Sequence, residues 1–152
     1  MALIDVIPTA IHRGESELPF VDVGDGTHLQ VLQVDVEKGL WVVRTRYEPG
    51  VTIARHKHTG EVFAFTIAGS WKYLEYPEVN RAGSYLYEPA GSVHTLQCIE
   101  DNTRVWFHMY GVNLNLDADG NVESVADGAG TLAFYLAMCE EMGLPRPNVL
   151  ID

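Results

Sequence analysis

The sequence predicts an all-β domain, a closed barrel or sandwich of about eight to ten short strands followed by one helix. Short β-branched and aromatic runs alternate with turn residues at close intervals along most of the chain. Helical spacing of apolar residues occurs near the C-terminus. With 152 residues and 47% hydrophobic content, residues 1–152 are expected to form a single domain with its own core.

Charge and composition exclude several classes of partner. The formal net charge of −11 argues against nucleic acid, whose phosphates an acidic protein would repel. No basic run offers a membrane patch, and no apolar run approaches the roughly 20 residues needed to span a bilayer. The first residues do not resemble a signal peptide, and Cys98 and Cys139 suit a reducing compartment. We therefore expect a cytoplasmic protein.

Residues 1–20 are expected to form an N-terminal arm. Their apolar residues are interrupted by Pro8, Gly14 and Pro19, which favour extended backbone over regular structure. Such an arm packs along a sheet or a partner subunit, and a loose terminus is the alternative. Together with exposed strands, the arm predicts a homodimer.

The strands that follow are delimited by turn chemistry. Glu48-Pro49-Gly50 is typical, because proline supplies a φ near −65° and glycine a positive φ. Residues 77–82 read as a polar loop between strands. Strands are expected at residues 30–36, 40–47, 51–58, 62–67, 71–76, 84–88, 94–99 and 104–112.

Residues 114–122 contain acidic residues in an order that resembles the start of an EF-hand loop. That loop needs glycine at its sixth position and glutamate at its twelfth, where this chain has Val122 and Gly128. A β-hairpin with Asp119-Gly120 as its turn is the better interpretation.

Residues 128–143 are expected to form the C-terminal helix. Asp127 precedes it as an N-cap, and Gly143 stands where a C-terminal cap belongs. The helix should pack on the barrel or on a second subunit, and the tail from Pro145 should be extended. Its apolar face is expected to comprise Leu132, Tyr135, Leu136, Cys139 and Met142.

Three histidines form the candidate metal site. His56 and His58 lie two apart on one expected strand, so they share a face, and His94 begins another strand after a similar glycine-bounded turn. An exposed His-x-His pair on an edge strand is the plainer alternative. Because the glycine-bounded turn before His94 resembles the one associated with His56 and His58, we expect all three histidines to converge on one divalent ion. Imidazole nitrogens suit iron, zinc, copper and nickel rather than calcium or magnesium.

In these two stretches the sequence resembles the cupin superfamily, which implies a double-stranded β-helix, or jelly-roll barrel. Most cupins place a metal-binding glutamate where this chain has Val62, and an asparagine where it has Cys98. Glu61 is adjacent to Val62, but a shift of one residue points a side chain to the opposite face. The matching positions are Gly50, His56, His58 and Gly69 in the first motif, and Gly83, Pro89, Gly91 and His94 in the second.

Without that carboxylate, the metal would keep its full double positive charge, which favours an anionic bidentate substrate such as an enolate. The pattern resembles the three-histidine iron cupins, most strongly the 2,4'-dihydroxyacetophenone dioxygenase family and more distantly acetylacetone dioxygenases. The likeness lies in residues 55–58, 71–75 and 87–96. It implies a mononuclear non-heme iron(II) dioxygenase that uses O2 to cleave a carbon–carbon bond of a hydroxyketone or diketone, although zinc or nickel also fit.

Two glutamates and several pocket residues complete the candidate site. Glu88 precedes Pro89 and could accept a hydrogen bond from a ligand imidazole, while Glu75 could act as a fourth ligand or a base. Surface carboxylates are the alternative for both. Aromatic residues on barrel strands are often plain core. The residues expected to line the pocket are Val62, Phe65, Trp71, Tyr73, Trp106 and His108.

Two other functions fit the same pattern. A metal-binding sensory or small-molecule-binding cupin needs no oxygenase activity, and some anti-sigma factors contain a similar module with zinc bound. An isomerase or a sugar-modifying cupin would work with zinc or without metal. Fold alone does not separate these activities.

Overall fold

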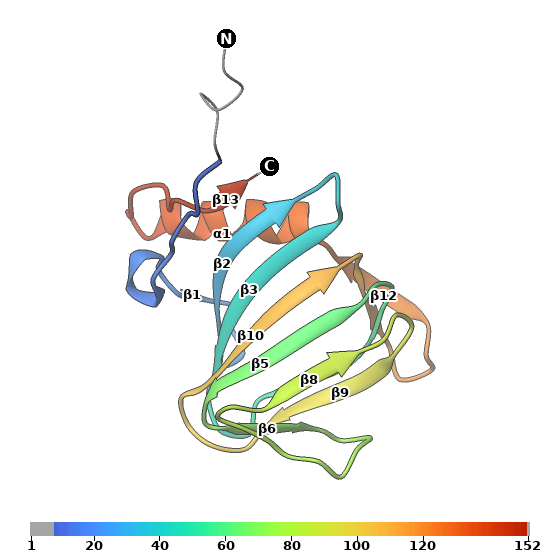
Figure 1. The fold of residues 1–152 in the computed structure, drawn as a ribbon. Coiled ribbons are helices and arrows are strands. Elements are labelled where there is room, and N and C mark those ends of the chain that lie inside the picture. Colours follow the sequence, from blue (N-terminus) through green and yellow to red (C-terminus); the bar gives the residue numbers. More distant parts are fainter. Residues whose placement is uncertain (1–7, 152) are drawn as a thin grey trace.

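The computed structural model describes residues 8–151 and is built around two β-sheets stacked face to face. The expected all-β jelly roll with a C-terminal helix is confirmed (Figure 1). The first sheet contains, in spatial order, β1 (Val21–Asp22), β2 (Thr27–Asp35), β3 (Leu40–Tyr47), β10 (Thr103–Tyr110), β5 (Val62–Ala68) and β8 (Tyr85–Glu88), and β13 (Leu150–Ile151) pairs in parallel with β2. The second contains β12 (Val122–Ala126), β11 (Asn113–Leu116), β4 (Thr52–His58), β9 (Val93–Cys98), β6 (Ser70–Tyr73) and β7 (Asn80–Arg81).

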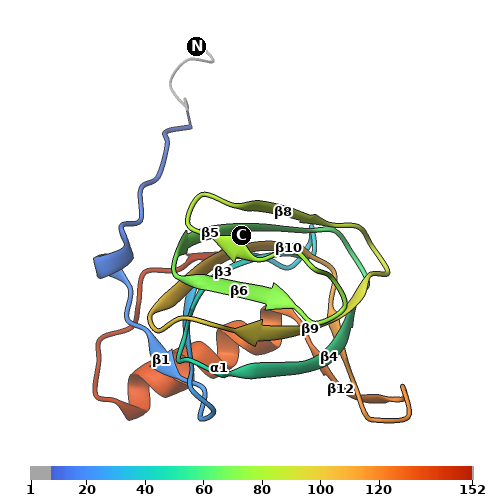
Figure 2. The ribbon, with the colours of Figure 1, turned by 90° about the horizontal axis from the view of Figure 1, so that it is seen from below.

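The core lies between the two sheets. Seen from below, β5 and β8 lie on one side of the interior, and β4 and β9 on the other (Figure 2). Because side chains alternate along a strand, one set from each strand faces inward. In β10 the inward set is Val105, Phe107 and Met109, all buried. This alternation decides which residues can reach the site.

The strands largely follow the predicted order, with small differences at their ends. β2 begins three residues earlier than expected, and β6 ends at Tyr73 rather than continuing to residue 76. The expected polar loop at residues 77–82 contains the two-residue strand β7. The hairpin of β11 and β12 replaces the EF-hand alternative, and Gly120 in its turn has a φ of 85°.

The helix α1 (Gly128–Glu141) packs against β2 near the end of the first sheet (Figure 1). The Asp127 carboxylate accepts a hydrogen bond from the Gly130 N–H at 2.7 Å, so the predicted N-cap is present. Tyr135 and Cys139 are buried as expected. Met142 is 51% exposed, because it stands at the C-cap, where the chain leaves the sheet, and so it does not belong to the buried face.

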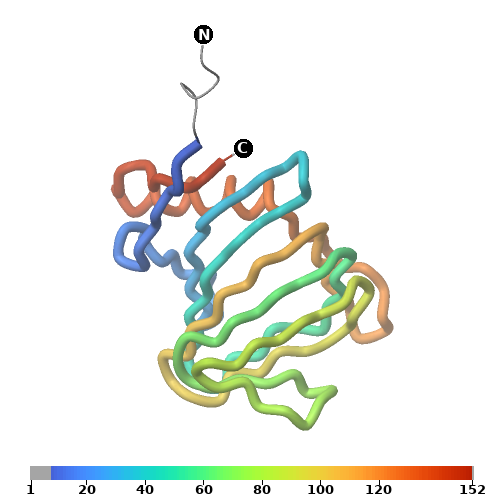
Figure 3. The backbone as a smooth tube through the Cα atoms, in the orientation of Figure 1, coloured from blue at the N-terminus to red at the C-terminus, as the bar shows by residue number. Residues whose placement is uncertain are grey.

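The described part of the N-terminal arm lies beside the C-terminal tail (Figure 3). Its Arg13 Nε donates to the Asn148 carbonyl at 2.6 Å, and a short 3-10 helix, η2 (Glu15–Glu17), follows. Leu18 is buried against Leu32, Leu40 and Val42 on the outer face of the first sheet. Residues 1–7 of the expected arm lie outside the described residues. In residues 8–151, no helix has the length and apolar character to cross a membrane.

Candidate metal centre

Three histidines from neighbouring strands of the second sheet face the barrel interior. His56 and His58 lie on β4, and His94 lies on β9, directly opposite His56 in the antiparallel register. Their exposed fractions are 6%, 4% and 1%. The alternative of an exposed His-x-His pair on an edge strand does not hold, because β4 lies between β9 and β11.

The three imidazole rings form a nearly equilateral triangle. Their centroids are 4.8 Å apart for His56 and His58, 5.0 Å for His56 and His94, and 4.9 Å for His58 and His94. One ring nitrogen from each lies within 4.8 Å of the others. The structure thus brings together the three residues that the motif spacing singled out, at a separation suited to one ion.

Hydrogen bonds orient two of these rings. The Nδ1 of His56 lies 2.8 Å from the Ala54 carbonyl oxygen, and the Nδ1 of His58 lies 2.6 Å from the Asn113 Oδ1. Because both partners are oxygens that only accept, each Nδ1 carries the proton and each Nε2 keeps its lone pair. Asn113 lies opposite His58 in the β11–β4 register, a pairing that no sequence motif signalled.

Burial keeps the imidazoles of His56 and His58 neutral. Desolvation is the largest cause that lowers the pKa of His56, and it lowers the pKa of His58 to about 4 despite the opposing effect of Glu88. A neutral imidazole is the form that coordinates a metal. At neutral pH, His56 and His58 are therefore ready to bind an ion without first losing a proton.

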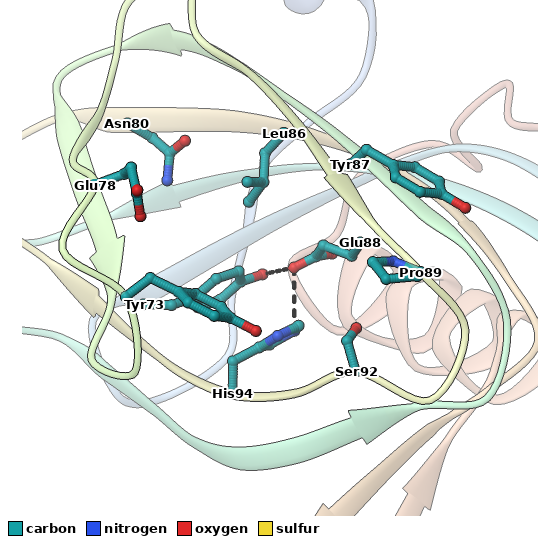
Figure 4. A pocket seen from close by; sticks show the side chains of 10 residues that line it. Tyr73, Glu78, Asn80, Leu86, Tyr87, Glu88, Pro89, Ser92 and His94 are labelled. Carbon is teal, nitrogen blue, oxygen red and sulfur yellow. Dashed lines mark hydrogen bonds and ion pairs between the residues drawn. The ribbon is translucent and has the colours of Figure 1, made fainter.

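Glu88 joins the cluster from the opposite sheet. Its carboxylate is 3% exposed at the end of β8, and Oε1 lies 3.0 Å from the His94 Nε2. The Tyr73 hydroxyl donates to the same oxygen (Figure 4). The Tyr73 ring stacks on His94, with centroids 3.8 Å apart and an interplanar angle of 16°. Burial, with Glu88 as the second cause, raises the pKa of Tyr73, so its phenol stays a proton donor.

Unpaired buried atoms test whether these residues fit a metal. The Nε2 atoms of His58 and His94 and the Oε2 of Glu88 are buried and have no hydrogen-bond partner. Leaving such atoms unpaired costs roughly 1–3 kcal/mol each. The donor set, imidazole nitrogen with a carboxylate oxygen, is one that first-row divalent ions accept. The residues present therefore fit a metal ion.

Comparison with known proteins places the chain in a family. The family model described as the ChrR cupin-like domain matches residues 10–113, more than half of the chain. The chain belongs to the cupin superfamily. No curated protein sequence matches it.

Solved structures share the cupin fold over nearly the whole chain. An RmlC-like cupin from Ralstonia eutropha JMP134 is 26% identical with a TM-score of 0.86, covering 98% of each chain. A cupin-like protein of unknown function from the same organism is 34% identical with a TM-score of 0.79, covering 93% of this chain and 96% of its own. An acetylacetone dioxygenase from Acinetobacter johnsonii is 19% identical with a TM-score of 0.74, covering 88% and 94%. At that identity it shows the fold alone.

Two cavities of this cupin border the histidine cluster. The inner one, of about 220 Å³, reaches His56 and His58 and has mostly apolar walls, including Trp41, Phe107 and Met109. The other, of about 240 Å³, borders His94 and Glu88 and opens between β6 and β8. The Tyr73 side chain borders both cavities, and its role in binding a substrate stays a prediction.

Other predicted pocket residues of the cupin lie elsewhere. Phe65, Trp106 and His108 line an open hollow of about 460 Å³ on the outer face of the first sheet, which corrects the expectation that they face the site. The reason is strand alternation, which turns Phe107 inward and both of its neighbours outward. Arg104 lies two residues before Trp106 on the same strand, so both side chains point to the same face. Because Arg104 is charged, the sequence could have indicated that this face is the outer one.

Val62 and Trp71 are fully buried in the core, where the Trp71 Nε1 donates to the Thr66 Oγ1 at 2.9 Å. Neither borders the two cavities at the histidines. Glu61 points outward and accepts a hydrogen bond from the Tyr87 hydroxyl, as the one-residue shift predicts.

Glu75 takes part in a structural contact of the cupin. Its carboxylate accepts hydrogen bonds from the Thr95 N–H at 2.7 Å and from the Thr95 Oγ1 at 3.0 Å. These bonds tie the turn after β6 to β9 next to His94. Both oxygens are thus engaged with Thr95, and Glu75 does not lie among the imidazoles.

Proposed function

We propose that this cupin is a mononuclear non-heme dioxygenase that holds iron(II) at His56, His58 and His94 and cleaves a carbon–carbon bond of a hydroxyketone or diketone. The observation that carries the proposal is the convergence of three buried imidazoles beside an apolar cavity. The resemblance of residues 55–58, 71–75 and 87–96 to the 2,4'-dihydroxyacetophenone dioxygenase family supports this reaction class. Three nitrogen ligands also suit zinc and nickel. The identity of the metal as iron is therefore proposed together with the reaction.

The size of the inner cavity supports a small substrate. About 220 Å³ is less than the roughly 300–1,000 Å³ of sites that hold drug-sized ligands. We propose a ketone with at most one ring, whose apolar part packs against Trp41, Phe107 and Met109. Its oxygen atoms would then face His56 and His58, which border the same cavity.

The reaction needs both a metal and a dry site. Bound iron(II) supplies Lewis-acid and one-electron chemistry with O2. The chain's own residues hold the substrate, and the apolar walls exclude water from it. A terminal hydroxyketone R–CO–CH2OH and one O2 would give R–COOH and HCOOH, so that each acid carries one oxygen atom from O2.

Oxygen uptake tests the proposal. Protein purified without oxygen and reconstituted with iron(II) is expected to consume one O2 for each ketone cleaved, across a panel that includes 2,4'-dihydroxyacetophenone and acetylacetone. Zinc-loaded protein is the control and is expected to consume none, because zinc has no redox chemistry. His94→Ala should also lose uptake. An iron-loaded protein that consumes no oxygen with any ketone of the panel would contradict the proposal.

A metal-binding sensory cupin is the second candidate. The match to the ChrR cupin-like domain favours it, because the description of that family names a domain and no enzyme activity. Metal analysis of protein prepared without added metal distinguishes the sensory cupin from the dioxygenase. Stoichiometric zinc, together with iron-loaded protein that is inert toward O2, would favour the sensor. An isomerase or sugar-modifying activity would instead appear with zinc or without metal.

We also propose that two copies associate and that the protein works in the cytoplasm. Support for the homodimer is an aromatic face on the outside of the first sheet, defined as Phe63, Phe65, Tyr85, Trp106 and His108. Exposed apolar patches of this kind mark interaction surfaces. Support for the cytoplasm is that Cys98 and Cys139 are both unpaired and buried, as in a reducing compartment.

A further inference from the structure

The strand next to Val62 carries a buried carboxylate. Val62 occupies the position at which most cupins have a metal-binding glutamate, and Glu88 is its direct partner in the antiparallel register of β5 and β8. Side chains opposite each other on an antiparallel pair point to the same face, with Cβ atoms about 4.5–5.5 Å apart. Val62 and Glu88 are 0% and 3% exposed. Glu88 thus enters the interior beside the place that the missing carboxylate would occupy.

The distances to the histidines suit coordination. Glu88 Oε1 lies 3.0 Å from the His94 Nε2, and Oε2 lies 3.8 Å from the His58 Nε2. Two ligand atoms at about 2.1 Å from one ion, at a right angle, are about 3 Å apart. Figure 4 shows the carboxylate directed at the His94 ring.

The hydrogen bonding of Glu88 leaves one oxygen for an ion. Tyr73 donates to Oε1, whereas Oε2 and the His58 Nε2 are buried without a hydrogen-bond partner. The His94 Nε2 makes no hydrogen bond either, and its one polar contact is the 3.0 Å approach to Glu88 Oε1. A buried carboxylate with an unpaired oxygen is costly, and a cation is the group that would satisfy all three atoms together.

We propose that Glu88 is the fourth protein ligand of the metal, so that the carboxylate of the site comes from β8 instead of β5. This inference rests on the proposed metal centre but not on the oxygenase reaction. One carboxylate would halve the charge of a divalent ion that three neutral imidazoles leave intact. A substrate would then meet a weaker positive charge than the valine at position 62 alone implies.

Cobalt(II) binding tests the inference without catalysis. We expect Glu88→Val to weaken cobalt affinity more than 100-fold, beyond the roughly 10–100-fold that follows loss of a group that only orients a ligand. The double substitution Val62→Glu with Glu88→Val returns a carboxylate to β5 and is expected to restore affinity to within tenfold. Glu61→Gln, one residue from Val62 and outward-facing, removes the same charge and should change affinity less than threefold.

A smaller loss in Glu88→Val, or a loss that the double substitution does not restore, would overturn the inference. If either variant fails to fold, a crystal structure of the unmodified protein loaded with cobalt(II) decides the question. A Glu88 oxygen within about 2.3 Å of the cobalt supports ligation, and one beyond about 3 Å overturns it. Cobalt bound by the three histidines alone would leave the metal centre and the oxygenase proposal standing. Protein that binds no cobalt would refute the metal centre as well.

Discussion

Asn113 shows how one side chain can set the chemistry of a neighbouring ring. Its amide oxygen lies 2.6 Å from the His58 Nδ1 and fixes the tautomer that leaves Nε2 free. The backbone pairing of β11 and β4 places the two residues opposite each other, so the contact depends on the fold rather than on local sequence.

We predict that Asn113→Ala weakens zinc affinity about 10–100-fold, because the His58 ring loses the group that orients it. Competitive zinc titration measures the change. Asn115→Ala is the matched control, since Asn115 lies two residues along the same strand and bonds to the Ser124 hydroxyl instead of a ligand histidine. Equal affinity of Asn113→Ala and the unmodified protein would show that the ring needs no such partner.

The part of the site that depends on residues close together in the sequence could be predicted. Two histidines two apart on a strand must share a face, and the structure places His56 and His58 together. The position of Glu88 could not be predicted, because it depends on which strand pairs with β5 and in which register. Phe65 and Trp106 were assigned to the wrong face because an aromatic run does not by itself reveal its inward set.

At the scale of strands and helices, turn and cap residues allow the boundaries of the elements to be predicted. The Pro49-Gly50 turn separates β3 from β4 as expected, and Gly50 has a φ of 79°. The Asp127 cap and the C-terminal Gly143, with a φ of 72°, bound the helix within two residues of the prediction. Two-residue strands such as β7 were not predicted, since so short a pairing is decided by the neighbouring strand and not by propensity.

Removing the helix cap should lower stability by a measurable amount. We expect Asp127→Ala to reduce the free energy of unfolding by about 1 kcal/mol, because the Gly130 N–H loses its acceptor. Urea unfolding should show a lower midpoint at unchanged slope. Asp119→Ala removes the same charge in the exposed hairpin and should stay within about 0.5 kcal/mol. A drop of equal size in both variants would attribute the effect to charge rather than to capping.

At the scale of the whole molecule, one part of the outer face of the first sheet is covered by the N-terminal arm and another part is open. Leu18 of the N-terminal arm covers β2 and β3, whereas the aromatic face over β5, β8 and β10 stays open. Phe65 and Trp106 there are 45% and 42% exposed. A second copy placed against this face would bury them.

We predict that Phe65→Lys converts a dimer into a monomer, because a charge at the centre of the aromatic face would lose its hydration on association. Light scattering after size-exclusion chromatography measures the mass. Leu74→Lys, at an equally exposed apolar residue outside this face, should leave the mass unchanged. An unmodified protein that runs as a monomer would refute the homodimer.

The three histidines and Glu88 belong to different sheets, and β8 is an edge strand held by β5 alone within its sheet. An ion bound by all four side chains would link the two sheets at the edge where the cavity beside His94 and Glu88 opens. Metal uptake would then stiffen the sandwich mechanically, and the slowest amide hydrogens to exchange in the loaded protein would include those of β8.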